Sequence, residues 1–218
     1  FSSRRRHTRL AILSRGLGDV YKRQGDIRGS ILDTSETLFA RQGYAATSLR
    51  QIADEVDVNP AMINYYFGGK RRLLQAVLER VLEPLAAAIA TMRQAGQAPA
   101  AEIVQLLLQT FGRHPNLPYL VVREIMLPGG EMQAHFLEYL APRLGGAIPG
   151  MLQREQAAGR MREDLDPAIC TVILMSLCAF PFIARQLAQP ALNVTLDEPG
   201  RALLEQHIQQ LLEGGFSP

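Results

Sequence analysis

The sequence lacks the features expected of a membrane-spanning or disulfide-bonded protein. Its only cysteines are Cys170 and Cys178, and eight helical residues would separate them by about 12 Å, too far for a disulfide. Free, buried thiols in a reducing cytoplasm are therefore expected. The most apolar stretch, Ile169–Ile183, is shorter than the ~18 residues of a membrane span and contains Ser176 and Pro181. It is predicted to be a buried helix, and no membrane partner is expected.

The sequence also lacks the patterns that carry catalysis. It contains no paired nucleophile and base, no phosphate-binding loop and no spacing typical of metal ligands. Glu131, His135 and Glu138 recur at helical intervals of four and three residues, which suits a metal, but no fourth ligand is nearby in the sequence. An exposed polar helix face is the preferred interpretation. We therefore expect no enzyme, no metal and no cofactor.

The net charge of +2 conceals a strongly basic N-terminal segment. Residues 1–24 contain seven basic side chains and one acidic side chain, and they share no pattern with the rest of the chain. The segment resembles translated sequencing-adapter sequence, so a non-native, disordered extension is predicted. The alternative is a genuine basic arm that tracks phosphates.

From residue 25 onward the apolar residues recur at helical spacing, without strand-like alternation or an internal repeat. An all-α fold is predicted, with a small N-terminal domain over 25–69 and a larger helical domain over 70–218. A first helix is expected to end at Gly43, and a long helix to run from Lys70 to about residue 94 with a kink at Pro84. Later helices are predicted at about 99–112, 117–127, 130–157, 167–189 and 199–213. Glycines and prolines should bend or break the 130–157 element, and Asp166-Pro167 and Glu198-Pro199 should start helices.

Residues 47–70 form the most informative stretch, TSLRQIADEVDVNPAMINYYFGGK. Thr47 or Ser48 is expected to cap a short helix over 49–56, with Gln51 completing a capping box. After a turn at Asp57, Asn59 should cap a second short helix whose first residue is a proline. Two helices joined by a turn of three or four residues allow the second to lie in the major groove of DNA. The domain over 25–69 is therefore predicted to be a helix-turn-helix.

The stretch ILDTSETLFARQGYAATSLRQIADEVDVNPAMINYYFGGKRRLLQAVLE resembles the DNA-binding domain of the tetracycline-repressor (TetR/AcrR) family of transcriptional regulators. The likeness keeps its register across three helices and two turns. Two positions depart from the family pattern. Asp57 stands where the family usually has glycine, and we expect it to strain the turn. Asn64 stands where the family often has tyrosine, which leaves the preferred DNA sequence open.

The resemblance also implies which residues bind DNA. An Asn amide can pair with adenine and an Ala methyl can meet the thymine methyl, whereas Tyr65 and Lys70 would bind phosphates. Residues 25–80 hold seven basic and seven acidic side chains, so affinity must come from placed groups rather than bulk charge. The implied DNA-binding residues are Tyr44, Ser48, Arg50, Asn59, Ala61, Asn64, Tyr65 and Lys70.

For the larger domain the resemblance implies a small-molecule effector and a homodimer. The apolar stripes of the helices at 167–189 and 199–213 would be covered by four-helix packing across a two-fold axis. Such a dimer presents two recognition helices about 34 Å apart to a palindromic operator in double-stranded DNA. The candidate effector-pocket residues are Met92, Met126, His135, Tyr139, Cys178 and Phe182, and for each of them a plain core role is the alternative.

The resemblance as a whole implies a ligand-responsive, DNA-binding transcriptional regulator in the bacterial cytoplasm, associated with the nucleoid. Its most direct form is a repressor that a small apolar or amphipathic effector releases from DNA. The alternative is a family member that acts through protein partners or DNA architecture without an effector. The sequence leaves open the effector, the operator, the regulated genes, and whether the protein represses or activates.

Overall fold

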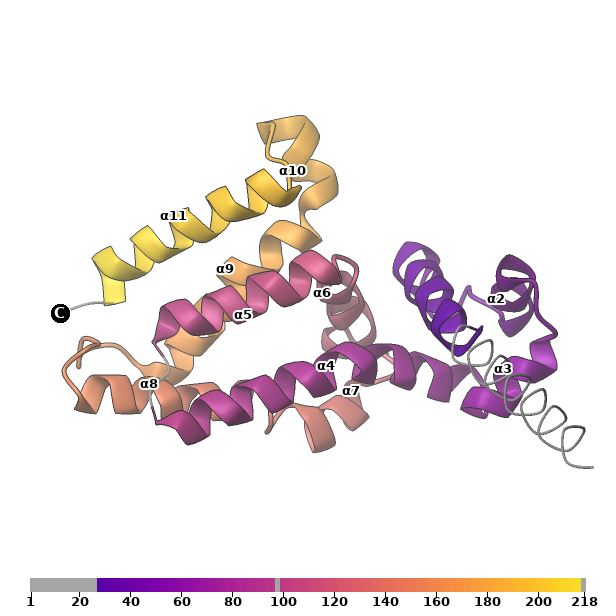
Figure 1. Cartoon of the computed structure of the whole chain (residues 1–218), viewed down its shortest axis with the longest axis horizontal. Helices are drawn as coiled ribbons and strands as arrows, with labels where there is room; N and C mark the ends of the chain where they lie inside the picture. Colours follow the sequence, from indigo (N-terminus) through magenta and orange to yellow (C-terminus); the bar gives the residue numbers. More distant parts are fainter. Residues whose placement is uncertain (1–26, 97–98, 217–218) are drawn as a thin grey trace, which may run out of the picture. The chain divides into compact units, whose positions relative to one another are not determined.

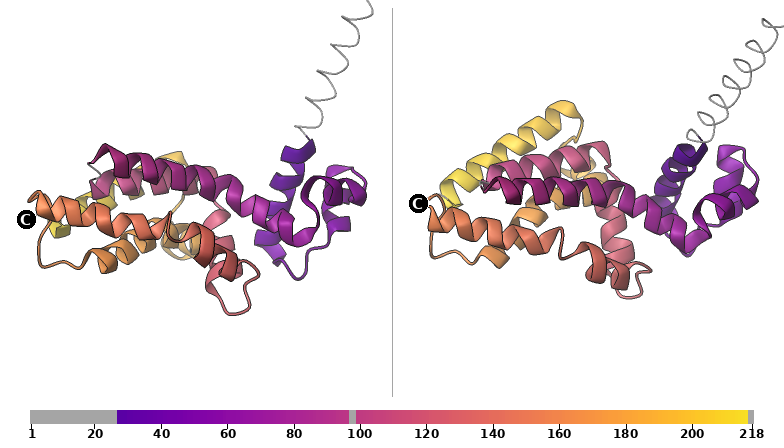
Figure 2. Two further views of the ribbon diagram at one scale, coloured as in Figure 1. Left: turned by 90° about the horizontal axis from the view of Figure 1, so that it is seen from below. Right: turned by 60° about the horizontal axis from the view of Figure 1, so that its bottom comes forward.

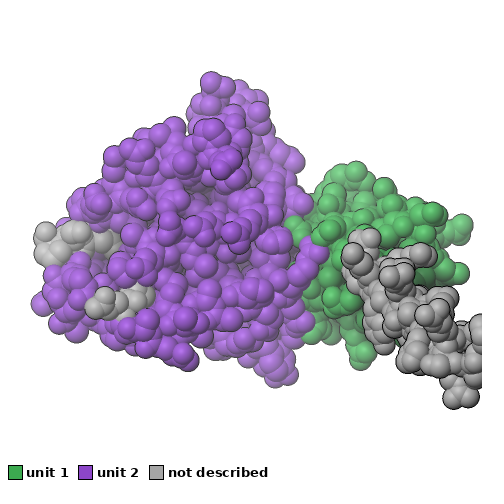
Figure 3. All heavy atoms as spheres, viewed as in Figure 1, with its two compact units in different colours: residues 1–77 green, residues 78–218 purple. Residues whose placement is uncertain are grey.

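The computed structural model describes residues 27–96 and 99–216, in two compact units that comprise residues 1–77 and 78–218 (Figure 3). Every regular element in the described residues is a helix, which confirms the all-α prediction (Figure 1). The segment over 1–24, predicted to be a disordered extension, lies outside the described residues.

The first unit contains a helix over 27–42, α2 (Leu49–Val56), α3 (Pro60–Phe67) and the start of α4 (Lys70–Ala95). Its core is formed by apolar side chains at helical spacing, of which Ile31, Phe39, Ile52 and Ile63 are fully buried. The first helix ends at Gly43, whose φ of 89° is left-handed and whose amide donates to the Phe39 carbonyl at 2.9 Å. The predicted glycine cap is thus confirmed, because glycine adopts this backbone without steric cost.

The second unit begins within α4 and continues through short and long helices. They are α5 (Ala100–Arg113), α6 (Leu117–Val121), the π-helix η1 (Val122–Met126), α7 (Gln133–His135), the π-helix η2 (Phe136–Leu140), the 3₁₀ helix η3 (Gly145–Ala147), α8 (Ile148–Ala157), α9 (Pro167–Ile183), α10 (Arg185–Leu192) and α11 (Glu198–Phe216). Helix α5 packs against both α9 and α11, and α8 packs against α9 (Figures 1 and 2). Side chains from these helices form the core of the unit.

Two of the predicted helical elements, over 130–157 and 167–189, are interrupted in the structure. The predicted 130–157 element consists of α7, η2, η3 and α8, so the expected break is confirmed. The prediction of one helix over 167–189 is wrong, because the chain breaks at Ala184 and α10 is bent by 73° from α9. Pro181 has no N–H to donate in the last turn of α9. Just after the break, the Arg185 side chain donates to the Pro115 carbonyl at 3.2 Å.

No single described helix is both long and apolar enough to cross a membrane, although the bent pair α9 and α10 meets those criteria by length and composition together.

The starts of α9 and α11 are capped by aspartate side chains a few residues away. Asp166 caps α9 by accepting from the amides of Ala168 and Ile169, as predicted. At α11 the Gly200 amide donates to Asp197, one residue before the predicted Glu198.

Candidate DNA-binding surface and effector cavity

The start of α2 is held by a network around the predicted cap. Ser48 is the N-cap, and its Oγ accepts from the Gln51 amide at 3.1 Å. Thr47 is buried, and its hydroxyl donates to the Gly43 carbonyl at 2.7 Å. The Gln51 side chain accepts from Gln42 Nε2 at 2.7 Å, so it ties α2 to the first helix instead of completing the predicted capping box. The Ser48 side chain is therefore engaged in positioning the helix-turn-helix.

The turn between α2 and α3 requires a left-handed residue. Asp57 has φ 56° and ψ 48°, and the Val58 amide donates to the Ala53 carbonyl at 2.9 Å. Ala53 is fully buried where the two helices approach each other. Asp57 therefore replaces the family's usual glycine at a left-handed position. Glycine is favoured there, since the left-handed region costs an L-residue about 1–2 kcal/mol.

Helix α3 has one buried and one exposed face. Asn59 caps it by accepting from the Ala61 amide at 2.8 Å, and Pro60 occupies the first helical position. Ile63 and Phe67 are buried, whereas Ala61, Asn64 and Tyr65 are exposed. Among the described residues the Asn64 amide makes no hydrogen bond, so both its donor and its acceptor can meet a ligand. The side-chain oxygen of Asn59 already accepts from the Ala61 amide in the cap.

Two of the predicted DNA-binding residues are cationic. Lys70 Nζ lies 4.2 Å from the centroid of the Tyr44 ring and 3.3 Å from the Ala45 carbonyl oxygen, so Lys70 and Tyr44 are held together. Arg50 extends from α2, with its side chain 86% exposed and 4.0 Å from Asp54. The predicted DNA-binding residues therefore share one unit, and each is half-buried or exposed.

The second unit contains a cavity of about 640 Å³ that opens to the surface, since its wall residues Met126, Val172 and Phe180 are exposed. Its walls come from α4, α5, α6 and η1, the segment from η2 to the start of α8, and α9. Apolar side chains dominate the wall, among them Leu85, Ile89, Phe111, Val122, Phe136, Leu144 and Phe180. Thr171 and Ser176 supply the hydroxyls of the wall, and each donates at 2.8 Å to a carbonyl of its own helix. Within the described part of the chain no charged side chain lines the cavity, so it suits an uncharged, apolar ligand.

Of the predicted pocket residues, Met126 lines this cavity and the other five do not. Met92 is half-buried on α4, and Tyr139 is exposed with its ring 5.0 Å from the His135 ring. Cys178 and Phe182 are buried on α9, where burial raises the pKa of the Cys178 thiol to about 12.

The reason for this distribution is geometric. Side chains such as Cys178 point from α9 into the packed core, whereas the wall is formed by the residues of α9 that lie on another of its faces. The apolar spacing of Leu82, Leu85 and Ile89 was visible in the sequence, but nothing in it marked these residues as facing a cavity. Glu131, His135 and Glu138 form no metal site, since no three potential ligands gather in the described parts of the chain.

Two helices of the second unit expose large apolar side chains. On α9, Ile169 is 60% and Val172 is 64% exposed. On α11, Leu203 is 56% and Leu211 is 63% exposed. These are the two helices on which the sequence predicted a dimer interface.

The first unit has the geometry of a helix-turn-helix, and the second is a helical unit with an apolar cavity. Together they define a DNA-binding regulatory protein. Residues 31–77 match the family model of the bacterial regulatory proteins of the tetR family. Residues 99–212 match the family model of the tetracyclin repressor-like C-terminal domain. The chain therefore belongs to the TetR family, whose members are transcriptional regulators rather than enzymes.

Individual relatives agree with this assignment. The chain is 27% identical to the HTH-type transcriptional repressor NicS of Pseudomonas putida over 157 residues, which are 70% of this chain and 74% of NicS. It is 22% identical to the HTH-type transcriptional repressor KstR2 of Rhodococcus jostii over 88% of this chain and 92% of the relative. The structure of the ketosteroid transcriptional regulator KstR2 of Mycobacterium tuberculosis matches with a TM-score of 0.70 at 16% identity, over 88% of this chain and 95% of that one. At this identity the structural match establishes the fold alone.

Proposed function

We propose that the protein is a ligand-responsive transcriptional repressor that binds a palindromic operator as a homodimer and is released by a small apolar effector. The observation that carries the proposal is the combination of an exposed α3 face with an uncharged cavity of about 640 Å³ in the other unit. The names of the similar NicS and KstR2, both repressors, favour repression over activation. The protein would act in the cytoplasm, at the nucleoid.

In this proposal Asn64 reads a base in the major groove. Its amide can form the bidentate pair with adenine, whereas the side-chain oxygen of Asn59 already accepts a hydrogen bond from the Ala61 amide. Ala61 would meet a thymine methyl, and Tyr65 would reach a phosphate. The backbone contacts would be completed by Tyr44, Ser48, Arg50 and Lys70.

The properties of the cavity favour an apolar effector. The cavity volume falls within the usual range of about 300–1,000 Å³ for ligand pockets. The hydroxyls of its wall already donate to backbone carbonyls. A charged ligand would lose its hydration there without gaining a partner of opposite charge. Neutral compounds with fused rings or alkyl chains are therefore the preferred class.

A homodimer would cover the exposed apolar faces of α9 and α11. Burial of such side chains contributes about 25 cal/mol for each Å² removed from water. Helix α4 is continuous from Lys70 to Ala95, and it contains both a proposed phosphate contact and the cavity residues Leu82, Leu85 and Ile89. An effector with higher affinity for one position of α4 would shift the protein toward that position and change the spacing of the two recognition helices.

Selection of duplexes from a random pool, followed by affinity measurements, tests the DNA side of the proposal. Substitution of Asn64 by Ala should change the preferred sequence, and substitution of Lys70 by Ala should weaken binding to all sequences and lower the salt slope by about one. Failure of the wild type to select any duplex would refute the proposal.

A thermal-shift screen of neutral apolar compounds tests the effector side. A ligand present at about 100 times its Kd should stabilise the protein by about 2.7 kcal/mol. If no compound stabilises a protein that binds its duplex, the result favours the second candidate, a regulator that acts through protein partners or DNA architecture.

A further inference from the structure

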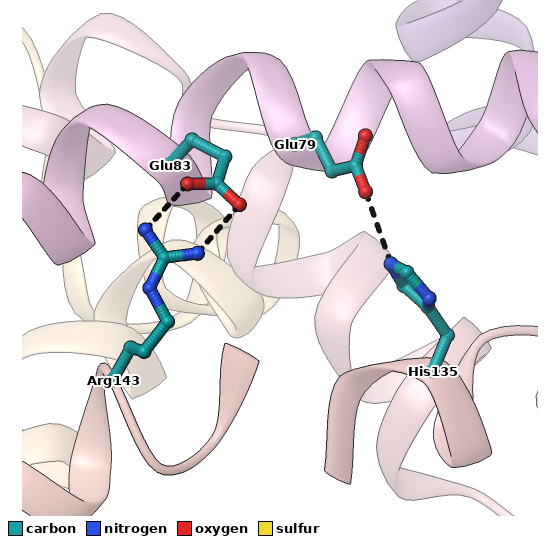
Figure 4. Close-up of polar contacts among 4 residues, drawn as sticks. All are labelled: Glu79, Glu83, His135 and Arg143. Atoms are coloured by element: carbon teal, nitrogen blue, oxygen red, sulfur yellow. Dashed lines mark hydrogen bonds and ion pairs between the residues drawn. The ribbon is translucent and has the colours of Figure 1, made fainter. Parts of the chain in front are cut away.

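Two contacts join α4 to a segment far away in the sequence (Figure 4). His135 Nε2 lies 3.0 Å from Glu79 Oε1. Arg143 donates from both terminal nitrogens to the carboxylate of Glu83, at 2.8 and 2.7 Å. Because Glu79 and Glu83 are four residues apart on one helix, the two acceptors lie on the same side of α4. We call this pair of contacts the α4 clasp.

The segment that carries the clasp also forms part of the cavity wall. Phe136, Ala141 and Leu144 lie between or beside His135 and Arg143 in the sequence, and all three line the cavity. The backbone here is not a regular α-helix, since η2 is a π-helix and η3 is a 3₁₀ helix. A 3₁₀ helix has poorer hydrogen-bond geometry than an α-helix, and single π-turns frequently occur at functional sites. We therefore expect this wall to be easier to displace than the wall formed by the 26-residue α4.

The clasp lies beside the weakest point of α4. Pro84 has no N–H, so the carbonyl of Arg80 cannot receive the helical hydrogen bond from that position. Glu79 and Glu83 flank that carbonyl in the sequence. The clasp thus braces α4 where its own backbone bonding is interrupted, on the side that faces the wall segment.

We propose that the α4 clasp couples occupancy of the cavity to the position of α4. An apolar ligand that displaces the wall at Phe136 and Leu144 would draw His135 and Arg143 away from their carboxylates and release α4 at Pro84. This inference rests on the proposed function, because it names the contacts through which the effector acts. It assigns Glu79, Glu83, His135 and Arg143 as positioning residues that touch neither DNA nor ligand.

The test compares full-length variants in binding to a duplex selected with the wild type. Glu83→Gln and Arg143→Gln each break the bidentate pair, and a double variant, Glu83→Arg with Arg143→Glu, restores it with reversed charges. Arg162→Gln is the matched control, because Arg162 forms a similar bidentate pair with Asp164, two residues away, that does not involve α4. Melting curves establish that each variant is folded.

Duplex affinity is measured with and without N-phenyl-1-naphthylamine, a neutral apolar fluorophore that serves as the cavity probe. The single clasp variants should bind the duplex up to about fivefold more weakly, the upper range for one exposed ion pair. The factor by which the probe weakens binding should shrink in the same variants. The charge-reversed pair should recover both properties, and Arg162→Gln should match the wild type.

Wild-type affinity and an unchanged probe response in Glu83→Gln and Arg143→Gln would overturn the inference and leave the proposed function standing. Weakened binding that the charge-reversed pair fails to recover would also overturn it, because the loss would then not come from the ion pair. A wild type that selects no duplex would remove the proposed function and this inference together.

Discussion

The turn residue Asp57 allows backbone strain to be separated from charge in the DNA-binding unit. With φ 56° and ψ 48°, the position lies in the left-handed region, where an ordinary L-residue pays about 1–2 kcal/mol. The steric cost is smaller for Asp, since its short side chain tolerates this region, and it is absent for Gly, which instead loses about 0.5–1 kcal/mol of backbone entropy. We therefore expect Asp57→Gly to raise the free energy of unfolding by about 0.5 kcal/mol and Asp57→Ala to lower it by about as much.

The resulting gap of about 1 kcal/mol between the Gly and Ala variants should appear as about 2–4 °C in Tm for a chain of this size. Asp57→Asn keeps the left-handed tolerance and removes the charge. Residues 25–80 hold equal numbers of basic and acidic side chains, so loss of one carboxylate leaves this stretch with a net positive charge. The Asn and Gly variants should therefore both bind DNA more tightly, with a steeper salt dependence.

Asn193 provides a matched control, because it is the other described non-glycine residue with positive φ, at 55°. Its Gly and Ala variants should show the same order of stability but leave DNA affinity unchanged. An Asp57→Ala variant as stable as Asp57→Gly, measured by urea unfolding, would refute the strain argument. DNA affinity that stays at the wild-type value in Asp57→Asn would refute the charge argument.

Three further predictions concern the described side chains. Ser35→Ala should stabilise the protein by about 1 kcal/mol in urea unfolding, because the fully buried Ser35 hydroxyl has no hydrogen-bond partner among the described residues. The hydrogen bonds from Arg143 lower the pKa of Glu83 below 4.5, so their contribution is present above pH 4.5 and is lost as the pH falls through the folded-state pKa. Wild type and Glu83→Gln should thus differ by no more than about 1 kcal/mol at pH 7 and converge in acid. With a pKa of about 12, Cys178 should resist alkylation by iodoacetamide at pH 8 until the protein unfolds, which mass spectrometry can follow.

Locally encoded features of this chain could be predicted from the sequence. The caps at Ser48, Asn59 and Asp166 were correct because a cap joins a side chain to an amide two or three residues away. The predictions of a left-handed backbone at Gly43 and Asp57 are confirmed for the same reason, since φ depends on nearest neighbours. The helix-turn-helix is built from these short-range features, so it was recognised in full. The family assignment followed from it.

The cavity and the α4 clasp were decided by tertiary structure alone. The cavity exists because five separate parts of the second unit leave space between them, and the sequence predicted only one of its wall residues, Met126, as part of the pocket. His135 and Tyr139 do not line it: His135 is paired with a carboxylate 56 residues away, and the Tyr139 ring lies beside the His135 ring. The break at Ala184 likewise coincides with a long-range contact, from Arg185 to the Pro115 carbonyl. Local patterns determine which segments are helices, whereas the space between helices depends on which faces meet, and that is settled only when the whole unit packs.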